Sequence, residues 1–182
     1  MAHAIALSAG HSAIVRGAEG FIDEVDEARR VCVQLAKDLE RRGVAVYGPF
    51  FDDISDDQSE NLNRIVDWHN DQPDHEYDVS VHFNASDAHE TSEPIGTECL
   101  YVSQERLADQ IAEAIHAASG LKNRGAKYRS DLKFLNSTDA KSVLLEICFV
   151  NSSADVTLYQ KHFHKICSAI AEVFADQGEE MA

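Results

Sequence analysis

The chain has 182 residues, of which 44% are hydrophobic, so it is long enough to bury the core of one domain. Its formal net charge of −16 argues against nucleic acid as a partner and against docking on anionic lipid. No run approaches the roughly 18 to 20 apolar residues of a membrane helix, and the first residues lack the basic and long apolar regions of a secretory signal. We therefore expect a protein made in the cytoplasm without an export signal and without membrane insertion.

The four cysteines form no CxxC pair and fall within apolar helix or strand patterns. A core of this size does not require disulfides for stability. We expect four free thiols, as is typical of proteins that fold in a reducing compartment.

Strand and helix patterns alternate along the chain. Period-two and continuous apolar runs predict strands over residues 3–9, 44–47, 77–83, 97–102, 132–135 and 142–150. Helical spacing predicts helices over 24–42, around 62–69, over 107–118 and over 163–174. This alternation predicts an α/β fold: a single domain over 1–182 with a mostly parallel, twisted sheet of about six strands and helices on both faces. In such sheets, ligands bind at the carboxyl ends of the strands.

The first strand ends at Gly10 and His11. Gly10 is expected to let the backbone turn sharply and place the His11 imidazole above the sheet edge. Glu24 lies in the first turn of the following helix, on the side that carries its apolar residues, so its carboxylate is expected to point toward the sheet. Glu27 is a second choice for that carboxylate. An ordinary loop histidine and a carboxylate placed to favour the helix dipole are the structural alternatives.

His82 lies near the end of an alternating strand, on the face opposite Val79, Val81 and Phe83. A histidine satisfied by hydrogen bonds in the core is the structural alternative. Glu146 lies inside the otherwise apolar run 143–150. Burying an ionised carboxylate costs several kcal/mol unless a cation or strong donors meet it, so either its pKa rises or a partner is present. Escape to solvent and pairing with a buried arginine are the alternatives for Glu146.

These four side chains come from strand ends or helix starts at one predicted edge of the sheet. Two histidines and one carboxylate are sufficient ligands for a catalytic zinc ion that keeps a position open for water. The remaining carboxylate is then free to act as a base. The residues predict a single Zn²⁺ site formed from His11, Glu24, His82 and Glu146.

The chain resembles the zinc-dependent N-acetylmuramoyl-L-alanine amidases of the amidase type 3 family, especially the catalytic domains of phage endolysins. The resemblance runs from Ala6 to about Phe174 and covers nearly the whole chain. It rests on four ordered motifs: Ala9-Gly10-His11-Ser12, Asp23-Glu24, Ser80-Val81-His82-Phe83-Asn84-Ala85-Ser86 and Leu144-Leu145-Glu146. The chain has Ser12 where many relatives have a second glycine, and its acidic run at 23–27 departs from theirs, which leaves Glu27 as the alternative to Glu24.

The resemblance implies that His11, Glu24 and His82 are the zinc ligands and that Glu146 is the general acid and base. It also implies cleavage of the amide between the lactyl group of N-acetylmuramic acid and L-alanine of the peptidoglycan stem peptide. Asn84, Arg124 and Lys127 lie in family-like segments and are candidates for substrate binding, with a solvated loop as the alternative for Arg124 and Lys127. Glu98 is a candidate for orienting a ligand, or else a structural residue of its strand.

The expected partner is peptidoglycan or its muropeptide fragments, bound by a monomer with no separate wall-binding domain. The expected biological role is that of a phage or prophage endolysin, which stays in the host cytoplasm and acts on the wall after release. Three alternatives remain at this point: a catalytically silent peptidoglycan-binding or regulatory domain, a delivered antibacterial toxin, and a zinc peptidase that cuts within the stem peptide. A silent domain is disfavoured because all four positions are filled.

Overall fold

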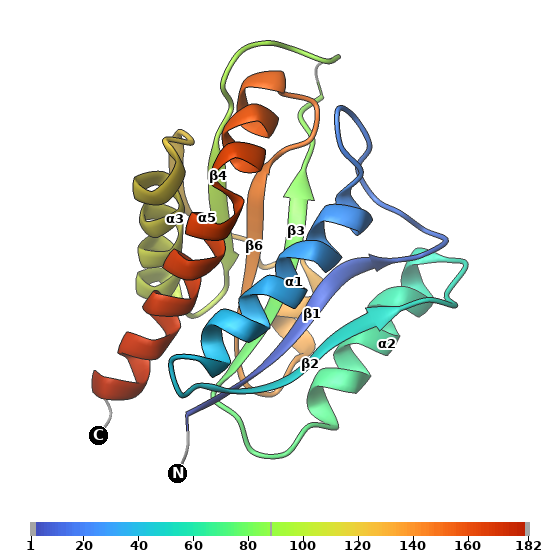
Figure 1. Ribbon diagram of the computed structural model, residues 1–182. Helices are drawn as coiled ribbons and strands as arrows, with labels where there is room; N and C mark the ends of the chain where they lie inside the picture. The colour runs from blue at the N-terminus through green and yellow to red at the C-terminus, as the bar shows by residue number, and fades with distance from the viewer. Residues whose placement is uncertain (1–2, 88, 181–182) are drawn as a thin grey trace.

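A computed structural model describes residues 3–87 and 89–180, with side chains described up to 178 (Figure 1). The strands in this part of the chain are β1 (Ala4–Ser12), β2 (Ala45–Asp52), β3 (Tyr77–Asn84), β4 (Thr97–Tyr101), β5 (Asn123–Tyr128) and β6 (Lys141–Phe149). The helices are α1 (Glu24–Glu40), α2 (Gln58–Asn70), α3 (Glu105–Ser119), α4 (Lys133–Ser137) and α5 (Ser153–Glu180). None of the described helices is both long and apolar enough to span a bilayer.

The strands form one six-stranded sheet in the order β2-β1-β3-β6-β4-β5. Strands β2, β1, β3 and β6 run parallel to one another, whereas β4 runs antiparallel to β6 and β5 runs parallel to β4. Helices cover both faces of the sheet. The predicted fold class, a mostly parallel α/β sheet in a single compact domain, is confirmed.

One predicted strand is wrong. Residues 132–135 belong mainly to the short helix α4, whose Phe134 and Leu135 are buried against the sheet. Two adjacent apolar residues in so short a segment fit a strand and a helix turn equally well. The sixth strand is instead β5, which was not predicted because it lies at the sheet edge, where its side chains are exposed or half-buried and show no apolar alternation.

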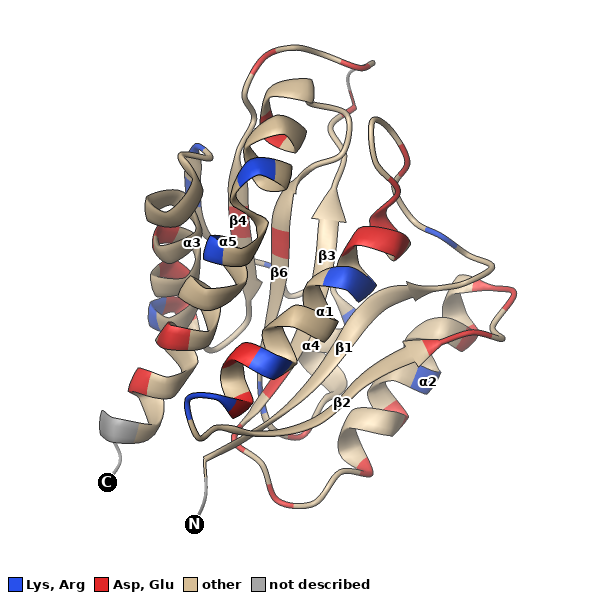
Figure 2. Cartoon of the chain, in the orientation of Figure 1, with Lys and Arg blue, Asp and Glu red and all other residues tan. Residues whose placement is uncertain are grey.

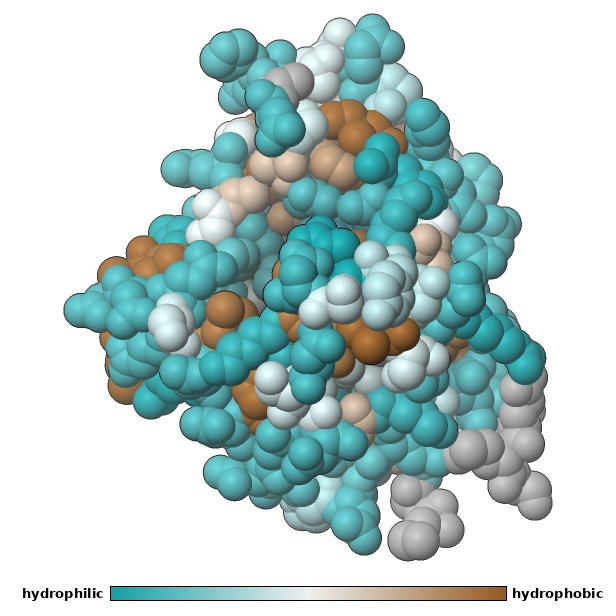
Figure 3. All heavy atoms as spheres, turned by 180° about the vertical axis from the view of Figure 1, so that it is seen from behind, coloured by the Kyte–Doolittle hydropathy of each residue, from teal (hydrophilic) through white to brown (hydrophobic). Residues whose placement is uncertain are grey.

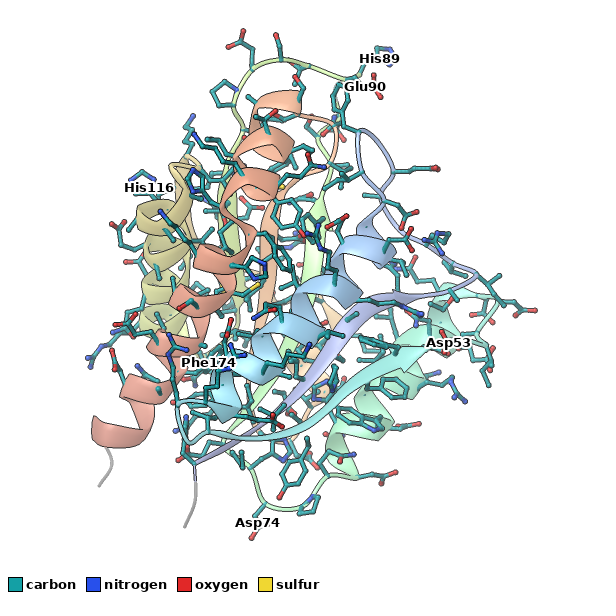
Figure 4. The ribbon with its side chains drawn as sticks, viewed as in Figure 1. Asp53, Asp74, His89, Glu90, His116 and Phe174 are labelled. Atoms are coloured by element: carbon teal, nitrogen blue, oxygen red, sulfur yellow. The ribbon has the colours of Figure 1, made fainter. Side chains whose placement is uncertain are left out.

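The front face of the sheet, toward the viewer in Figure 1, is covered by α1, α3 and α5. It carries the larger apolar core, to which β3 contributes Val79, Val81 and Phe83, each at most 1% exposed. Phe174, labelled in Figure 4, points from α5 toward the sheet, where its ring centre lies 5.8 Å from that of Tyr77. All four cysteines are buried as free thiols, as predicted.

The back face is covered by α2 and α4 over a smaller apolar cluster, which comprises Ile65, Leu100, Phe134, Leu135 and Leu144. Buried polar groups attach α2 to the sheet. The His69 imidazole lies 2.9 Å from Ser8 Oγ and 2.6 Å from Asp78 Oδ1, with all three side chains fully buried. Asp52, at the end of β2, accepts a hydrogen bond of 2.9 Å from Asn61 of α2. Viewed from this side, hydrophobic side chains form small separate patches among hydrophilic ones (Figure 3).

Candidate metal centre

A row of polar side chains crosses the back face of the sheet at one level. His82 of β3 is the register partner of Glu146 on β6, and Glu146 is the register partner of Glu98 on β4. Register partners on adjacent strands share a face, so these three side chains project together. Figure 2 shows the acidic positions on β4 and β6 as neighbours in the sheet. His11, at the carboxyl end of β1, lies beyond His82 and completes the row, with ring centres 5.2 Å apart.

Glu24 reaches this row from the other layer, because it is the first residue of the front-face helix α1. The helix starts here because the Asp23 side chain caps it and accepts a hydrogen bond from Asp26 N. Two backbone N–H groups fix the carboxylate: Ala18 N donates to Oε2 at 2.7 Å and Phe83 N donates to Oε1 at 3.2 Å. Glu24 is therefore buried, with its Oε1 atom facing the two histidines.

His11, Glu24 and His82 form a possible metal site, since one ligand atom from each lies within 4.8 Å of the other two. Glu24 Oε1 lies 3.2 Å from His11 Nε2 and 3.0 Å from His82 Nδ1. Ligands of a tetrahedral zinc ion at about 2.0 to 2.1 Å are separated from one another by roughly 3.3 Å. The spacing and the nitrogen and oxygen donors therefore fit a small divalent cation.

Two glycines leave the space that the three side chains occupy. A Cβ atom on Gly10 would lie 1.9 Å from His82 Cε1, and one on Gly17 would lie 2.5 Å from both Glu24 Oε2 and His11 Nε2. The sharp turn expected at Gly10 is wrong: the residue with positive φ is His11 itself, at 61°. Gly10 is needed for a different reason, because only a residue without a side chain leaves room for the imidazole of the neighbouring strand.

The ionisation of these groups suits cation binding. Burial opposes ionisation of Glu24, but hydrogen bonds from His11 and His82 outweigh it and hold the Glu24 pKa far below its ordinary value. Burial also lowers the pKa of His82, against the opposing effect of Glu24. A neutral imidazole has the lone pair that a metal ligand needs. His82 Nε2 lies 3.0 Å from Ser80 Oγ, which leaves Nδ1 as the nitrogen that faces the cluster.

Glu146 differs from Glu24 in that no hydrogen bond from a described residue compensates the burial of its Oε2 atom. The side chain as a whole is half-buried. Burial, together with the negative charges of Glu24 and Glu98, raises the Glu146 pKa well above its ordinary value, and Arg129 only partly opposes this. The Oε2 atom neither reaches solvent nor pairs with a buried arginine of the described chain, which were the two alternatives from the sequence. A proton-accepting group with a raised pKa beside a metal site is suited to proton transfer.

The row opens into a cavity of about 320 Å³ on the back face. His11, His82 and Glu146 line it on the sheet side. Its remaining walls come from two segments, α2 with Gln58, Asn61, Leu62 and Ile65, and the stretch after β5 with Arg129, Asp131, Leu132, Lys133 and Phe134. A pocket with a largely apolar floor and a few convergent polar groups is typical of a small-molecule or peptide site.

The other residues singled out from the sequence lie outside this cavity. Glu27, the second choice for the acidic ligand, accepts a 2.5 Å hydrogen bond from Tyr159 and is not part of the cluster that His11, Glu24 and His82 form. Asn84 donates to Glu98 at 2.9 Å, and Arg124 donates to the same carboxylate at 2.7 Å. Lys127 lies on the edge strand β5 with an exposed side chain. Neither Asn84, Arg124 nor Lys127 is among the residues that line the cavity.

Arg129 and Asp131 line the cavity and were not identified from the sequence. They follow β5, the strand that shows no alternation, so the sequence contains no sign that the chain returns to the sheet there. Asn61 and Gln58 were missed for a related reason. The predicted helix around 62–69 was recognised by its apolar residues, which do not show that its polar first turn faces a cavity.

The chain is similar to proteins of one family over nearly its whole length. A family model described as N-acetylmuramoyl-L-alanine amidase matches residues 5–175. Two uncharacterised proteins of Clostridium perfringens are 33% and 30% identical to it in alignments 163 positions long that cover 86% of this chain. The chain spans about half the length of these relatives, 47% and 46% respectively.

Solved structures share the fold. The catalytic domain of an endolysin that targets Clostridium difficile superposes with a TM-score of 0.84 at 24% identity, covering 96% of this chain and 97% of that one. An N-acetylmuramoyl-L-alanine amidase of Nostoc punctiforme superposes with a TM-score of 0.80 at 20% identity, covering 98% of each chain. At these identities, the likeness establishes the architecture alone.

Proposed function

The chain belongs to the N-acetylmuramoyl-L-alanine amidase family, and from this premise we propose that it hydrolyses the amide between the lactyl group of N-acetylmuramic acid and L-alanine of the peptidoglycan stem peptide. The observation that carries the proposal is the meeting of His11, Glu24 and His82 beside Glu146 at one end of a cavity. Family membership supports the substrate class, and this arrangement supports the kind of chemistry.

We propose zinc as the ion held by His11, Glu24 and His82. The donor set of two imidazoles and one carboxylate is typical of catalytic zinc. When bound there, a zinc ion supplies a Lewis acid that polarises the scissile carbonyl and acidifies a water molecule. Glu24 contributes the only negative charge among the three ligands, and its two backbone hydrogen bonds hold it in position before any ion binds.

Glu146 carries the proton in this proposal. Its Oε2 atom, which no described residue hydrogen-bonds, accepts the proton of the attacking water and returns it to the alanine nitrogen as the amide bond breaks. Burial raises the Glu146 pKa, and a cation held by the three ligands would oppose this rise, so that the group could both accept the proton and return it. Residues of α2 and of the segment after β5 form the walls of the cavity in which these transfers take place.

Digestion of purified peptidoglycan tests the activity, with the new ends identified by mass spectrometry. We expect wild type to release stem peptides with N-terminal L-alanine. Glu146→Gln is expected to retain zinc and to be slower by about 10² to 10⁴-fold, the usual contribution of a positioned acid or base. Full activity in Glu146→Gln, or new ends within the stem peptide, would contradict the proposal.

Metal analysis tests the ligands independently of turnover. His11→Ala and Glu24→Ala are expected to lose zinc, whereas Glu27→Gln, three residues along the same helix, is expected to keep it. Unchanged zinc content in Glu24→Ala would remove Glu24 from the site, and zinc loss in Glu27→Gln would reinstate the alternative.

We further propose that the protein acts as an endolysin, made in the host cytoplasm and active on the wall after release. The likeness to an endolysin catalytic domain supports this role. Expression in a host with the target wall chemistry is expected to leave cells intact until the membrane is permeabilised, after which turbidity falls. Lysis of cells with intact membranes would contradict the endolysin role without touching the amidase activity.

A further inference from the structure

A cationic side chain lies in the same cavity as the metal cluster. Arg129 follows β5 directly, and its backbone N–H donates to Tyr101 O at 2.9 Å, which fixes the start of the segment. Its side chain lines the cavity together with Glu146. The cations among the lining residues are Arg129 and Lys133, and the Lys133 ammonium is hydrogen-bonded to Asn63 of α2. The Arg129 side chain is 43% exposed, so a ligand that enters the cavity can reach it.

The guanidinium is oriented by a neighbour in the sequence. Arg129 Nε and Nη2 donate to the two carboxylate oxygens of Asp131, each at 2.8 Å. These hydrogen bonds lower the pKa of Asp131 to about 2, so the pair is ionised at neutral pH. Only one edge of the planar guanidinium is used in this way. Among the described residues, no hydrogen-bond acceptor meets Nη1, so the second edge can receive a carboxylate with two parallel hydrogen bonds.

The arginine suggested by the sequence is already engaged elsewhere. Arg124 donates to Glu98 at 2.7 Å, and its guanidinium lies 5.1 Å from the ring centre of Phe149. Lys127 lies on the exposed edge strand, outside the cavity. Arg129 is therefore the residue placed to meet an anionic group of a ligand that also reaches Glu146.

We propose that Arg129, oriented by Asp131, binds a free carboxylate of the stem peptide and makes the protein selective for stems that carry one near the scissile amide. This inference rests on the proposed function and adds a specificity determinant to it. The apolar floor of the cavity, with Leu100, Leu132 and Leu144, accommodates the uncharged part of the stem. A carboxylate that is amidated loses its charge and one acceptor oxygen, so it forfeits the two-bond contact.

The test uses two synthetic muropeptides that differ only at the second stem residue, which carries a free carboxylate in one and a carboxamide in the other. Wild type is expected to cleave the free carboxylate about 10- to 100-fold more efficiently, the range expected for hydrogen bonds to a charged group. Arg129→Gln is expected to remove this preference mainly by raising KM for the carboxylate substrate. Any change in kcat that follows from the altered Glu146 pKa is expected to be the same for both substrates, so the ratio of the two kcat/KM values falls to about 1.

Two further variants separate geometry from charge. Arg129→Lys is expected to recover only part of the preference, because an ammonium does not offer two parallel donors. Lys161→Gln removes one exposed positive charge from α5 and is expected to leave both substrates unaffected.

If Arg129→Gln keeps the wild-type ratio of kcat/KM values for the two substrates, the assignment is overturned and the amidase activity stands. If wild type cleaves neither muropeptide, the proposed function fails and this inference fails with it.

Discussion

On the front face of the sheet, Val79, Val81 and Phe83 of β3 belong to the large apolar core, whereas on the back face Ser80 and His82 of the same strand line a cavity together with residues of α2 and α4. One strand thus supplies two surfaces of opposite chemistry. The front surface is closed and apolar. The back surface combines a smaller apolar cluster with buried polar contacts and a cavity of about 320 Å³.

This difference indicates that the front face contributes most of the free energy of folding, whereas the back face carries the groups of the proposed chemistry. Fully burying a side chain such as Phe83 contributes about 1.5 to 3 kcal/mol, and the front core contains many of these. This surplus allows the back face to keep costly groups such as the unpaired Glu146 oxygen. Glu24 is the exception that joins the faces, since it begins a front-face helix and ends among back-face histidines.

The largest expected effect is the loss of stability when a front-face core residue is truncated. Phe83→Ala is expected to lower the free energy of unfolding by about 3 to 5 kcal/mol, measured by urea denaturation. Its ring contacts Tyr159, with ring centres 4.9 Å apart, so the truncation leaves a cavity in the core.

Ser80→Ala is the matched back-face change on the same strand. It is expected to cost about 1 kcal/mol, the contribution of one hydrogen bond, and to weaken zinc affinity by about 10- to 100-fold because Ser80 positions His82. Equal losses of stability in the two variants would break the comparison.

A methyl group placed between the strands tests the back face alone. Gly10→Ala is expected to displace the His82 imidazole and to lower kcat/KM by about 10²-fold, the penalty for a displacement of about 1 Å at a reacting centre. In a His82→Ala background, the same substitution is expected to have little effect on stability, because the clashing ring is gone. Wild-type activity in Gly10→Ala would show that the imidazole position is not limiting.

The smallest expected effect is a loss of stability in acid, where the attachment of α2 to the sheet through Asp52 weakens. Burial opposes ionisation of Asp52, but hydrogen bonds from Ser55, Asn61 and the backbone outweigh it and lower the Asp52 pKa to about 2. Because the folded pKa lies below the unfolded value of about 3.9, ionised Asp52 stabilises the fold above about pH 4. This contribution disappears as the pH falls through about 2.

The measurement compares wild type with Asp52→Asn in urea across this range. The difference in unfolding free energy is expected to shrink as the pH falls from about 5 to about 2. A difference that stays constant with pH would mean that Asp52 contributes through shape and not through charge.

The same division explains what the sequence alone could predict. Front-face residues repeat with a regular period, so the alternation of Val79, Val81 and Phe83 predicted a strand with one buried face. His82 was noted as a histidine on the other side of that alternation, and Glu146 because it interrupts an apolar run. The helical spacing also predicted that Glu24 faces the sheet, and it ranked Glu27 second; in the structure, Glu27 contacts Tyr159.

The rest depended on contacts that no local pattern encodes. Arg129 became visible only once β5 was seen to lie beside β4, and β5 lacks alternation because it is an edge strand. Gly10 was recognised as special for the wrong reason, since its partner is an imidazole 72 positions away in the chain, at His82. Distances between residues remote in sequence are what the three-dimensional structure adds.

The position of β6 in the sheet has a consequence for folding during synthesis. This strand lies between β3 and β4, yet it spans Lys141–Phe149, after all the other strands have been made. Most of the chain must therefore be synthesised before β6 can pair with β3 and β4 and join the two halves of the sheet. Pairing between strands so far apart in the sequence is slow, so during synthesis the place between β3 and β4 stays empty. Glu146 arrives with that last strand, and the polypeptide acquires its proposed proton carrier only in the step that completes the sheet.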